Sequence, residues 1–388
     1  MRILTAGESH GPELTAIIEG VPADLPLLAR DINVELARRQ AGYGRGDRMK
    51  IEKDQVCFIS GVRHGMTTGA PLTMVVKNKD FQNWQTIMSS DLLSKEDSKL
   101  RRLHHPRAGH ADLVGAQKYR HRDLRNVLER SSARETTMRV AIGAVAKKIL
   151  ATLDIFIASH VVNLGGIKVV VSDHLSVREI WEKSEISELR VVDVSVEKSM
   201  KELIDQAKTK GDTLGGIVEV VAEGMPAGVG SYVQWDKKLD AQISQALLSI
   251  NAFKGIEFGL GFKMANFLGS KVMDEIIWSK KKGYSRKTNH LGGFEGGMTN
   301  GMPLIIRGVM KPLPTLYKPL MSVDLDTHKP FQARGERSDV AATPAASVVA
   351  ESVVAFELAR ALCKQFTSDN MEQLKEGIAI QREYLREF

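Results

Sequence analysis

Two short motifs place a histidine where it could move a proton. In residues 7–11 (GESHG), two glycines flank a Ser-His pair directly after an apolar run, so the backbone can turn tightly and leave the imidazole of His10 accessible. In residues 106–112 (PRAGHAD), His110 lies three residues after an arginine and two before Asp112. Because histidine gains and loses a proton near neutral pH, both are candidate general acids. Taken alone, the first motif is also compatible with a structural histidine.

Residues 130–136 (RSSARET) combine two serines and two arginines at the expected start of a helix. Ser132, followed by Glu135 three residues later, has the pattern of a capping box. The start of a helix carries free backbone N–H groups and a partial positive charge, which attract anions. These residues therefore predict an anion-binding site, with an ordinary serine cap and solvated arginines as the alternative. A second group of arginines lies upstream, at Arg30, Arg38, Arg39, Arg45 and Arg48.

Three C-terminal motifs together have the composition of a ligand pocket: residues 292–297 (GGFEGG), 311–315 (KPLPT) and 334–339 (RGERSD). Glycines let a ligand approach the backbone closely, and the prolines hold Lys311 in a rigid turn. None of the three is diagnostic alone. The sequence has no Walker loop and no Gly-x-Gly-x-x-Gly that opens a helix, which disfavours the ordinary nucleotide-binding folds.

The histidines at positions 104, 105 and 110 could also suggest a metal site. No cysteine accompanies them, and neither the His-Glu-x-x-His order nor a zinc-finger spacing is present. We therefore expect no bound metal.

Composition excludes several classes of protein. The 388 residues are 43% hydrophobic and 26% charged, which is typical of globular proteins and not of disordered ones. The net charge of +7 is a mild excess over such a length, without a lysine tract, and few aromatic residues are present to stack on bases. The apolar runs are too short to span a membrane, no secretory signal is visible, and the only two cysteines lie far apart. We expect a cytoplasmic protein without disulfides that binds neither nucleic acid nor membranes.

A repeat links two parts of the chain. Residues 65–72 (GMTTGAPL) recur as residues 297–304 (GMTNGMPL) with six of eight positions identical, and EGVPA at 19–23 recurs as EGMPA at 223–227. Each copy is associated with strand-like apolar runs and a helical pattern. The expected strands are 3–5, 14–18, 73–76, 217–222 and 305–309, and the expected helices are 31–39, 133–153, 239–248 and 344–364.

In two stretches, the apolar residues do not recur at a regular helical or strand spacing. Residues 78–112 read as a long loop, of the kind that often forms a lid or a binding loop. Residues 173–214 are charged and partly helical, and we expect them to form a solvated surface without chemistry.

In their order and spacing, the motifs resemble those of the chorismate synthase family, of the monofunctional bacterial type. The resemblance runs from Met1 to about Leu362 and rests on TAGESHG, GYGRGDR, RAGHAD, RSSARET, GGFEGGMTNG, KPLPT and RSD. The family usually has proline where this chain has Ala108, which loosens the turn before His110 and leaves its assignment intact.

The resemblance implies a lyase of the shikimate pathway to aromatic amino acids. It would remove phosphate and one ring hydrogen from 5-enolpyruvylshikimate 3-phosphate in a 1,4-anti elimination that gives chorismate. Reduced FMN would be required and not consumed. In such an enzyme the cofactor would supply the reactive electrons, and the protein would position the substrate and stabilise its charges.

The resemblance also assigns roles to individual residues. His10 would protonate the departing phosphate, His110 would protonate the reduced flavin, and Asp339 would take a proton from flavin N5. The substrate's anionic groups would contact Ser9, Arg39, Arg45, Arg48, Arg107, Ser132, Arg134 and Arg337. FMN would be held by Arg130, Ser131, Ser132, Asn251, Ala252, Gly296, Lys311, Pro312, Leu313, Pro314, Thr315 and Arg337.

The implied fold is α+β, a single domain over residues 1–388. It would be a β-α-β sandwich with a helical layer between two sheets and a pseudo-two-fold repeat relating about 1–130 to about 210–340. Family members are homotetramers. Arg39 and Arg45 are sometimes assigned to a nicotinamide nucleotide, but we favour substrate anions because no nucleotide-binding fold accompanies them. NADPH would then act through a separate flavin reductase.

Two other classes of function remain as alternatives. A basic nucleic-acid binder would bind RNA with a steep salt dependence and no need for flavin. A flavin electron carrier or flavin reductase would oxidise NADPH without the shikimate substrate.

Overall fold

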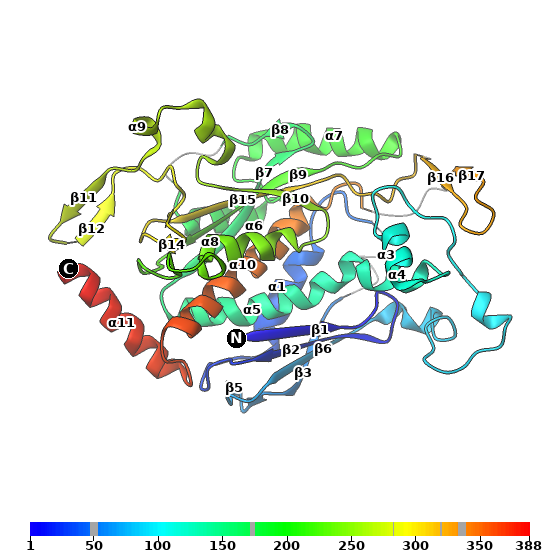
Figure 1. Cartoon of the computed structure of the whole chain (residues 1–388), viewed down its shortest axis with the longest axis horizontal. Coiled ribbons are helices and arrows are strands. Elements are labelled where there is room, and N and C mark those ends of the chain that lie inside the picture. Colours follow the sequence, from blue (N-terminus) through cyan, green and yellow to red (C-terminus); the bar gives the residue numbers. More distant parts are fainter. Residues whose placement is uncertain (47–52, 171–174, 282, 319, 333–338) are drawn as a thin grey trace.

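Two antiparallel sheets lie on either side of a layer of helices (Figure 1). The computed structural model describes residues 1–46, 53–170, 175–281, 283–318, 320–332 and 339–388. The first sheet has the strand order β1 (Arg2–Ala6), β2 (Glu13–Glu19), β6 (Leu72–Lys77) and β3 (Val56–Ser60). The second has the order β10 (Phe253–Phe258), β15 (Leu304–Met310), β9 (Gly216–Glu223), β7 (Phe156–Leu164) and β8 (Ile167–Lys168).

Four two-stranded hairpins accompany the sheets: β4 (Val62–Arg63) with β5 (Met66–Thr67), β11 (Ile276–Ser279) with β12 (Gly283–Arg286), β13 (Phe294–Glu295) with β14 (Met298–Thr299), and β16 (Met321–Val323) with β17 (Pro330–Gln332). The α-helices are α1 (Ala29–Gln40), α3 (Asp112–Tyr119), α4 (Arg125–Ser131), α5 (Thr136–Thr152), α6 (Val177–Ile186), α7 (Glu197–Thr209), α8 (Leu239–Leu248), α9 (Gly269–Val272), α10 (Thr343–Gln365) and α11 (Met371–Glu387). Short 3-10 helices are η1 (Lys79–Asn83), η2 (Asp97–Lys99), η3 (Ala133–Glu135), η4 (Val194–Val196), η5 (Trp235–Lys237) and η6 (Gly261–Asn266).

The strands and long helices expected from the sequence are all present, with ends shifted by a few residues at most. Alternation of buried and less buried residues in β2 turns Leu14, Ala16 and Ile18 toward the helices. Helix α10 is buried at nearly every position and α5 at most of them, which is the pattern of helices packed on more than one side. Pro344 stands in the first turn of α10, where the missing N–H of proline costs no helical hydrogen bond.

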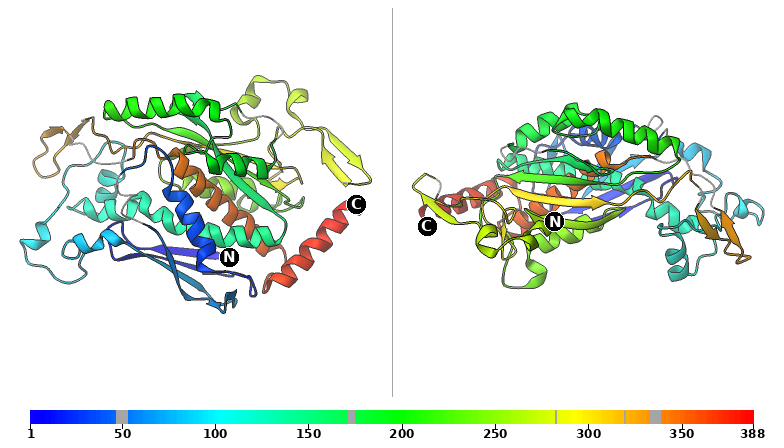
Figure 2. Two further views of the ribbon diagram at one scale, coloured as in Figure 1. Left: turned by 180° about the vertical axis from the view of Figure 1, so that it is seen from behind. Right: turned by 90° about the horizontal axis from the view of Figure 1, so that it is seen from above.

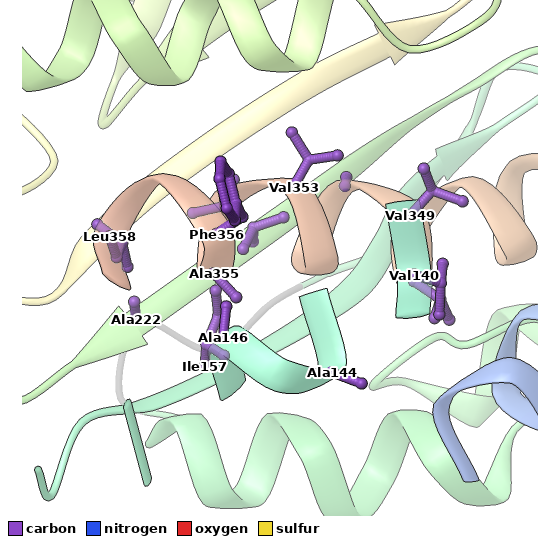
Figure 3. Close-up of a cluster of buried hydrophobic side chains, with 14 of the residues drawn as sticks. Val140, Ala144, Ala146, Ile157, Ala222, Val349, Val353, Ala355, Phe356 and Leu358 are labelled. Atoms are coloured by element: carbon purple, nitrogen blue, oxygen red, sulfur yellow. The ribbon is translucent and has the colours of Figure 1, made fainter. Parts of the chain in front are cut away.

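The central helices α5 and α10 touch closely at Gly143, and Figure 3 shows the buried apolar side chains that these helices share with β7 and β9. A Cβ atom at this position would lie 2.2 Å from Cβ of Ser352 on α10, so only glycine permits the contact. Around it, Val140 and Ala144 of α5 and Val349 and Val353 of α10 are buried in one cluster with residues of β7 and β9. This close packing fixes the layer to which both sheets attach.

The two copies of the sequence repeat occupy matching strand positions. Ile18 of β2 pairs with Leu72 of β6, and the corresponding Ala222 of β9 pairs with Leu304 of β15. Thr67 donates to the carbonyl of Pro22 at 2.6 Å, just as Thr299 donates to the carbonyl of Pro226 at 2.6 Å. The mixed α+β class is thus confirmed, whereas a two-fold relation between whole halves stays a prediction.

The capping box predicted at Ser132 is wrong in its second half. Ser132 caps η3 by accepting a hydrogen bond from the backbone N–H of Arg134 at 3.3 Å. Glu135, however, accepts from Arg139 one turn further on at 3.0 Å, because that guanidinium offers a charged donor on the same helix face. Residues 133–135 form a 3-10 turn, and α5 proper begins at Thr136.

The expectation of a purely solvated surface over residues 173–214 is also wrong. Glu185 accepts hydrogen bonds from Arg38 and Arg190, both at 2.6 Å, in the interior between α1, α6 and α10. Glu351 of α10 lies at the centre of this network and accepts from Arg38 at 2.8 Å and from Lys147 at 2.6 Å. These basic groups outweigh the effect of burial and hold the pKa of Glu351 well below its usual range. The charged stretch therefore supplies partners for buried charges of other helices.

The loop 78–112 and the β16–β17 hairpin lie at one end of the molecule, while α11 and the β11–β12 hairpin lie at the other (Figure 2). The loop contains η1 and η2 and otherwise lacks regular structure up to α3, as expected. Among the residues that the structure describes, no helix combines the length and apolar character needed to cross a membrane.

Candidate active site

The turn after β1 is held by α4 through both backbone and side chains. The backbone N–H of Ser9 donates to the carbonyl of Glu129 at 2.9 Å, and that of His10 donates to Oε2 of Glu129 at 2.9 Å. The same carboxylate lies 2.9 Å from Nδ1 of His10. Because Nδ1 is engaged by Glu129, the other ring nitrogen, Nε2, is the one left for a bound substrate.

Glu129 is ionised despite its burial. Burial favours the neutral acid, but hydrogen bonds from His10 and Arg125 and the charge of His10 outweigh it and lower the pKa of Glu129. Sequence reasoning missed this residue, although it immediately precedes the RSSARET motif.

Trp84 covers His10 from the loop 78–112. Its ring stacks on the imidazole with 4.0 Å between the ring centroids, and its indole N–H donates to Asp80 at 3.0 Å. The guanidinium carbons of Arg101 and Arg125 lie 4.3 and 5.0 Å from the centre of the indole ring. The predicted binding loop therefore reaches His10 and brings the cation Arg101 with it, while Arg125 approaches the indole ring from α4. The only clue in the sequence is a tryptophan within a long polar loop.

Arg134 stabilises the turn that carries Ser9 and His10 through its contact with Asn78. Its Nη1 donates to both carboxylate oxygens of Asp54 at 2.7 and 2.8 Å, and its Nε donates to Asn78 at 2.9 Å. Asn78 in turn donates to the carbonyl of Gly11 at 2.8 Å. This nearly fully buried arginine thus fixes the backbone next to His10 through Asn78. Its predicted contact with substrate stays a prediction.

Arg39 has an incompletely satisfied guanidinium. Nε donates to Thr136 at 3.0 Å and Nη2 to the carbonyl of Ala133 at 3.0 Å, while the buried Nη1 makes no hydrogen bond among the described residues. Its nearest ion-pair partner, Asp54, is 3.8 Å away. Burial, opposed by Asp54 and assisted by Arg45, lowers the pKa of Arg39 to about 10. A bound anion would satisfy Nη1 and offset this cost.

Arg45 and Asp339 form an ion pair beside Arg39. Nη1 of Arg45 lies 2.8 Å from Oδ2 of Asp339, and the backbone N–H of Gly46 donates to Oδ1 at 2.6 Å. The charges of Arg45 and Asp339 both act on Arg39, so the three side chains share one electrostatic environment. Two further predicted anion ligands, Arg48 and Arg337, lie outside the described residues.

Most of the predicted flavin-binding residues lie next to one another. The side-chain amide of Asn251 donates to the carbonyl of Ser131 at 2.9 Å, and the buried Oδ1 of Asn251 makes no hydrogen bond in the described part of the chain. The backbone N–H of Lys311 donates to the carbonyl of Ala252 at 3.0 Å. The open Oδ1 acceptor beside the carbonyls and the Lys311 cation suit a polar heterocycle with a phosphate group.

Arg130 and Ser132 connect this cluster to the histidine turn. Arg130 donates to the carbonyl of Thr5 at 3.0 Å, and the hydroxyl of Ser132 donates to that of Ser9 at 3.2 Å. The KPLPT turn is held at its middle, where Thr213 donates to the carbonyl of Leu313 at 2.8 Å. Pro312, Pro314 and Thr315 complete that turn.

Gly296 does not join this cluster. It stands in the β13–β14 turn, where the carbonyl of Gly297 accepts from Leu239 at the start of α8. Asn251 follows the other end of α8, and a helix of 10 residues is about 15 Å long. Within one chain, the structure therefore separates Gly296 from the other predicted flavin-binding residues.

His110 has the carboxylate partner that its motif predicts. Nδ1 of His110 lies 2.6 Å from Oδ1 of Asp112, and Arg107 donates to Oδ2 of the same carboxylate at 2.7 Å. Burial raises the pKa of Asp112, but His110 and Arg107 outweigh it and hold that pKa well below its usual range. Arg107 is thus already paired with Asp112, and its predicted substrate contact stays a prediction.

The loop that carries His110 lies against the KPLPT turn. A Cβ atom on Gly109 would lie 3.7 Å from Cβ of Pro314 and 3.8 Å from Nζ of Lys311. The contacts therefore run without a break from the His10 turn through Ser131, Asn251 and Lys311 to the His110 loop. The arrangement gathers two histidines with carboxylate partners around an excess of basic side chains, which fits acid catalysis on a polyanionic ligand.

The comparisons with known proteins agree over the whole chain. A family model described as chorismate synthase matches residues 1–363. The chain belongs to the chorismate synthase family. Chorismate synthases of Enterococcus faecalis (strain ATCC 700802 / V583) and Streptococcus suis (strain 05ZYH33) are each 64% identical to it over 388 residues, with full coverage of both chains. The chorismate synthase of Streptococcus pneumoniae (strain Hungary19A-6) is 62% identical, again over the full length of both.

A solved structure supports the same family membership. It is titled "Crystal Structure of Chorismate Synthase", is 42% identical in sequence and superposes with a TM-score of 0.81, covering 100% of this chain and 98% of the other. Its similarity confirms that the mixed arrangement of helices and strands is that of a chorismate synthase.

Proposed function

We propose that this chain catalyses the elimination of phosphate from 5-enolpyruvylshikimate 3-phosphate to give chorismate. Family membership over the full length supports the reaction. The observation that carries the assignment to this site is the series of contacts that links His10, oriented by Glu129, to Arg39. Ser9, next to His10, accepts a hydrogen bond from Ser132, and Arg39, whose Nη1 is open among the described residues, donates to the carbonyl of the following residue, Ala133. A substrate with two carboxylates and one phosphate needs such a positive, partly desolvated pocket.

His10 would act on the leaving group. Nδ1 is held by Glu129, so Nε2 is free to donate a proton to an oxygen of the departing phosphate. Trp84 keeps the imidazole in place and shields it from water on one face. As the carbon–oxygen bond breaks, phosphate leaves with that proton, and a ring hydrogen must be lost at the far end of the new diene.

The arginines would bind the substrate and limit its movement. Nη1 of Arg39 is the open donor, and Ser9 and Ser132 add hydroxyl groups at the same place. Arg45 is paired with Asp339, so it can contact a substrate anion only if its guanidinium binds both partners at once or if the ion pair with Asp339 breaks. We infer that these residues bind substrate and not a nicotinamide nucleotide, which agrees with the absence of a Gly-x-Gly-x-x-Gly motif from the sequence.

Reduced FMN would supply electron density to the substrate while phosphate leaves and recover it when the hydrogen is lost. The chain has groups that fit this cofactor: the open Oδ1 of Asn251 for a ring N–H, and Lys311 and Arg130 for its phosphate. Burial, with Lys254 close by, lowers the pKa of Lys311, and an adjacent anion would counteract this shift.

The two remaining candidates would handle protons on the cofactor side. His110, held by Asp112 at Nδ1, would donate a proton from Nε2, and Nη2 of Arg107, which lies 3.4 Å from this nitrogen, has to move away first. Asp339 would accept a proton at its carboxylate. Both of its oxygens are engaged by Arg45 and Gly46, so the ion pair has to loosen before the proton is taken up.

We further infer a homotetramer in the cytoplasm, with NADPH acting through a separate reductase. Exposed apolar side chains support self-association, because they gather on the β11–β12 hairpin and on α11 around a hollow of about 1230 Å³. They include Ile276, Trp278 and Phe388. Assembly would also allow Gly296 to contribute to the cofactor site of another subunit. We likewise propose that the two halves are related by a pseudo-two-fold axis, as the matching strand registers suggest.

Single substitutions test the roles of the three candidates. His10→Ala, His110→Ala and Asp339→Asn should each reduce turnover of the reduced-FMN enzyme roughly 10²- to 10⁴-fold while FMN still binds. His64→Asn, at an exposed turn with φ +53°, is the matched control and should leave turnover unchanged. Near-normal turnover of any one of the three variants would remove that residue from the scheme.

A further inference from the structure

Two histidines of the loop 78–112 meet an aspartate of the β16–β17 hairpin. Nε2 of His105 lies 3.0 Å from Oδ2 of Asp324, and Nε2 of His104 lies 3.4 Å from the same atom. One potential ligand atom from each of the three residues lies within 4.8 Å of the other two. This cluster takes no part in the contacts that build the site around His10 and His110.

The sequence motifs alone predict no bound metal, but the fold brings a remote aspartate to two of the histidines, and we infer that His104, His105 and Asp324 form a binding site for one divalent cation of the zinc type, which ties the loop 78–112 to the β16–β17 hairpin. Two imidazoles and one carboxylate are a common donor set for Zn²⁺. For a tetrahedral ion at about 2.0–2.1 Å from each ligand, the ligand atoms lie about 3.3 Å apart. The two spacings to Asp324, 3.0 and 3.4 Å, need only small adjustments, and the ligand atoms of the two histidines lie within 4.8 Å of each other.

The carboxylate is fixed in the orientation that binding requires. Oδ1 of Asp324 accepts from the backbone N–H groups of Asp326 and Thr327 at 2.9 and 2.8 Å and from the hydroxyl of Thr327 at 3.0 Å. Oδ2 is thereby directed at the two histidines. These hydrogen bonds, led by that from the backbone of Thr327, lower the pKa of Asp324 to about 2, so it is ionised at neutral pH.

The ring of one histidine and the backbone of the other are also restrained. The ring of His105 stacks on Phe331 of β17 with 3.7 Å between centroids, and the carbonyl of His104 accepts from the backbone N–H of Leu325 at 3.0 Å. Ligands held by packing and outer hydrogen bonds lose little entropy when they bind a metal.

The surrounding charge favours a cation. The charged side chains of Asp326 and Arg102 both act electrostatically with Asp324, and they pair with each other at 2.8 Å, so the negative charge of Asp324 is not neutralised by this pair. The site leaves at least one coordination position open for water or another ligand. Its location predicts that the metal restrains the segment that leads into Arg107 and His110.

Metal binding can be measured without the enzymatic reaction. The full chain, free of any histidine tag and treated with a chelator, is titrated with ZnCl₂ by calorimetry, and with CoCl₂ while the visible absorption of Co²⁺ is followed. We expect one Zn²⁺ per chain and the visible bands of low-symmetry Co²⁺. Because loss of outer partners alone typically weakens metal sites 10- to 100-fold, His105→Gln and Asp324→Asn should each weaken Zn²⁺ binding at least about tenfold.

A control on the same hairpin distinguishes this site from adventitious binding. His328→Asn removes an exposed histidine that is not part of the cluster and has φ +57°, which asparagine tolerates, so it should bind Zn²⁺ as the parent does. Zn²⁺ should also slow proteolysis within residues 78–112 in the parent and control, but not in the two ligand variants. If the parent binds no stoichiometric Zn²⁺ or Co²⁺, or if correctly folded ligand variants bind it unchanged, the proposal is wrong. Should one variant fail to fold, His104→Gln and the Co²⁺ spectrum of the parent decide the question.

Discussion

The contact between Glu129 and His10 yields the sharpest test of the site. Glu129→Gln keeps the shape of the side chain and removes its charge. The carboxylate accepts from the backbone N–H of His10, from Nδ1 of His10 and from Arg125, each at 2.9 Å. A glutamine has one acceptor oxygen and an NH₂ group, so it cannot satisfy all three donors.

The size of the effect follows from this loss. A charge-assisted hydrogen bond contributes about 1.5–3 kcal/mol, which corresponds to a roughly 10- to 150-fold loss of rate when the bond orients an acid in the transition state. We expect kcat/KM of Glu129→Gln to fall by that factor. FMN affinity should change little, because the hydrogen bonds of Glu129 in the described part of the chain go to Ser9, His10 and Arg125 and not to Asn251 or Lys311.

The assay is anaerobic formation of chorismate with reduced FMN, together with fluorescence titration of FMN and unfolding by urea. Glu135→Gln is the matched control, because Glu135 pairs with Arg139 one turn further along and should leave the rate unchanged. In a double-mutant cycle, Glu129→Gln should have little further effect once His10→Ala is present. Full activity of Glu129→Gln, or additive losses in the cycle, would refute the role of Glu129 in orienting His10.

Three further outcomes are expected. Trp84→Ala should lower kcat about 5- to 30-fold, because His10 loses its stacking partner and Arg101 and Arg125 lose the indole ring. Trp84→Phe should recover most of the rate, and equal rates for the two variants would contradict this. Glu351→Gln should lower the free energy of unfolding by about 3–5 kcal/mol in urea titrations, because Arg38 and Lys147 lose their buried counter-charge; a change below about 1 kcal/mol would show that the network is dispensable. Burial, against the attraction of Arg360, raises the pKa of Glu357 from 4.5 to about 7, so the stability linked to its proton is complete below pH 4.5 and is lost as the pH rises to 7. The free energy of unfolding of Glu357→Gln should therefore gain up to about 3 kcal/mol over that of the parent between pH 4.5 and pH 8. Curves of stability against pH that run parallel for the two proteins would contradict the shift.

The sequence predicted those features that are local along the chain. His110 and Asp112 are two residues apart, and the proline at position 344 marks the first turn of α10, so short-range pattern and capping chemistry were enough. The repeat of GMTTGAPL likewise predicted strands in two places because the same turn chemistry is used twice, with Thr67 and Thr299 each bound to a proline carbonyl.

The partners that complete the site are remote in sequence and could not be predicted from spacing. Glu129 is 119 positions from His10, and Asp54 is 80 positions from Arg134. Nothing in the local pattern says which acid meets which base, since that depends on how α4 and the first sheet pack. The same reason explains why Glu185 and Arg190, in a stretch rich in charge, were expected in solvent and lie in a buried network.

The central claim is that the site eliminates phosphate without net redox change, and stoichiometry tests it most directly. Purified protein is mixed anaerobically with photoreduced FMN and 5-enolpyruvylshikimate 3-phosphate, and phosphate and chorismate are followed together, with oxidised-FMN and substrate-free controls. We predict equal release of both products over many turnovers per flavin, and none with oxidised FMN. No product with reduced FMN bound, or oxidation of one flavin per substrate consumed, would contradict the account.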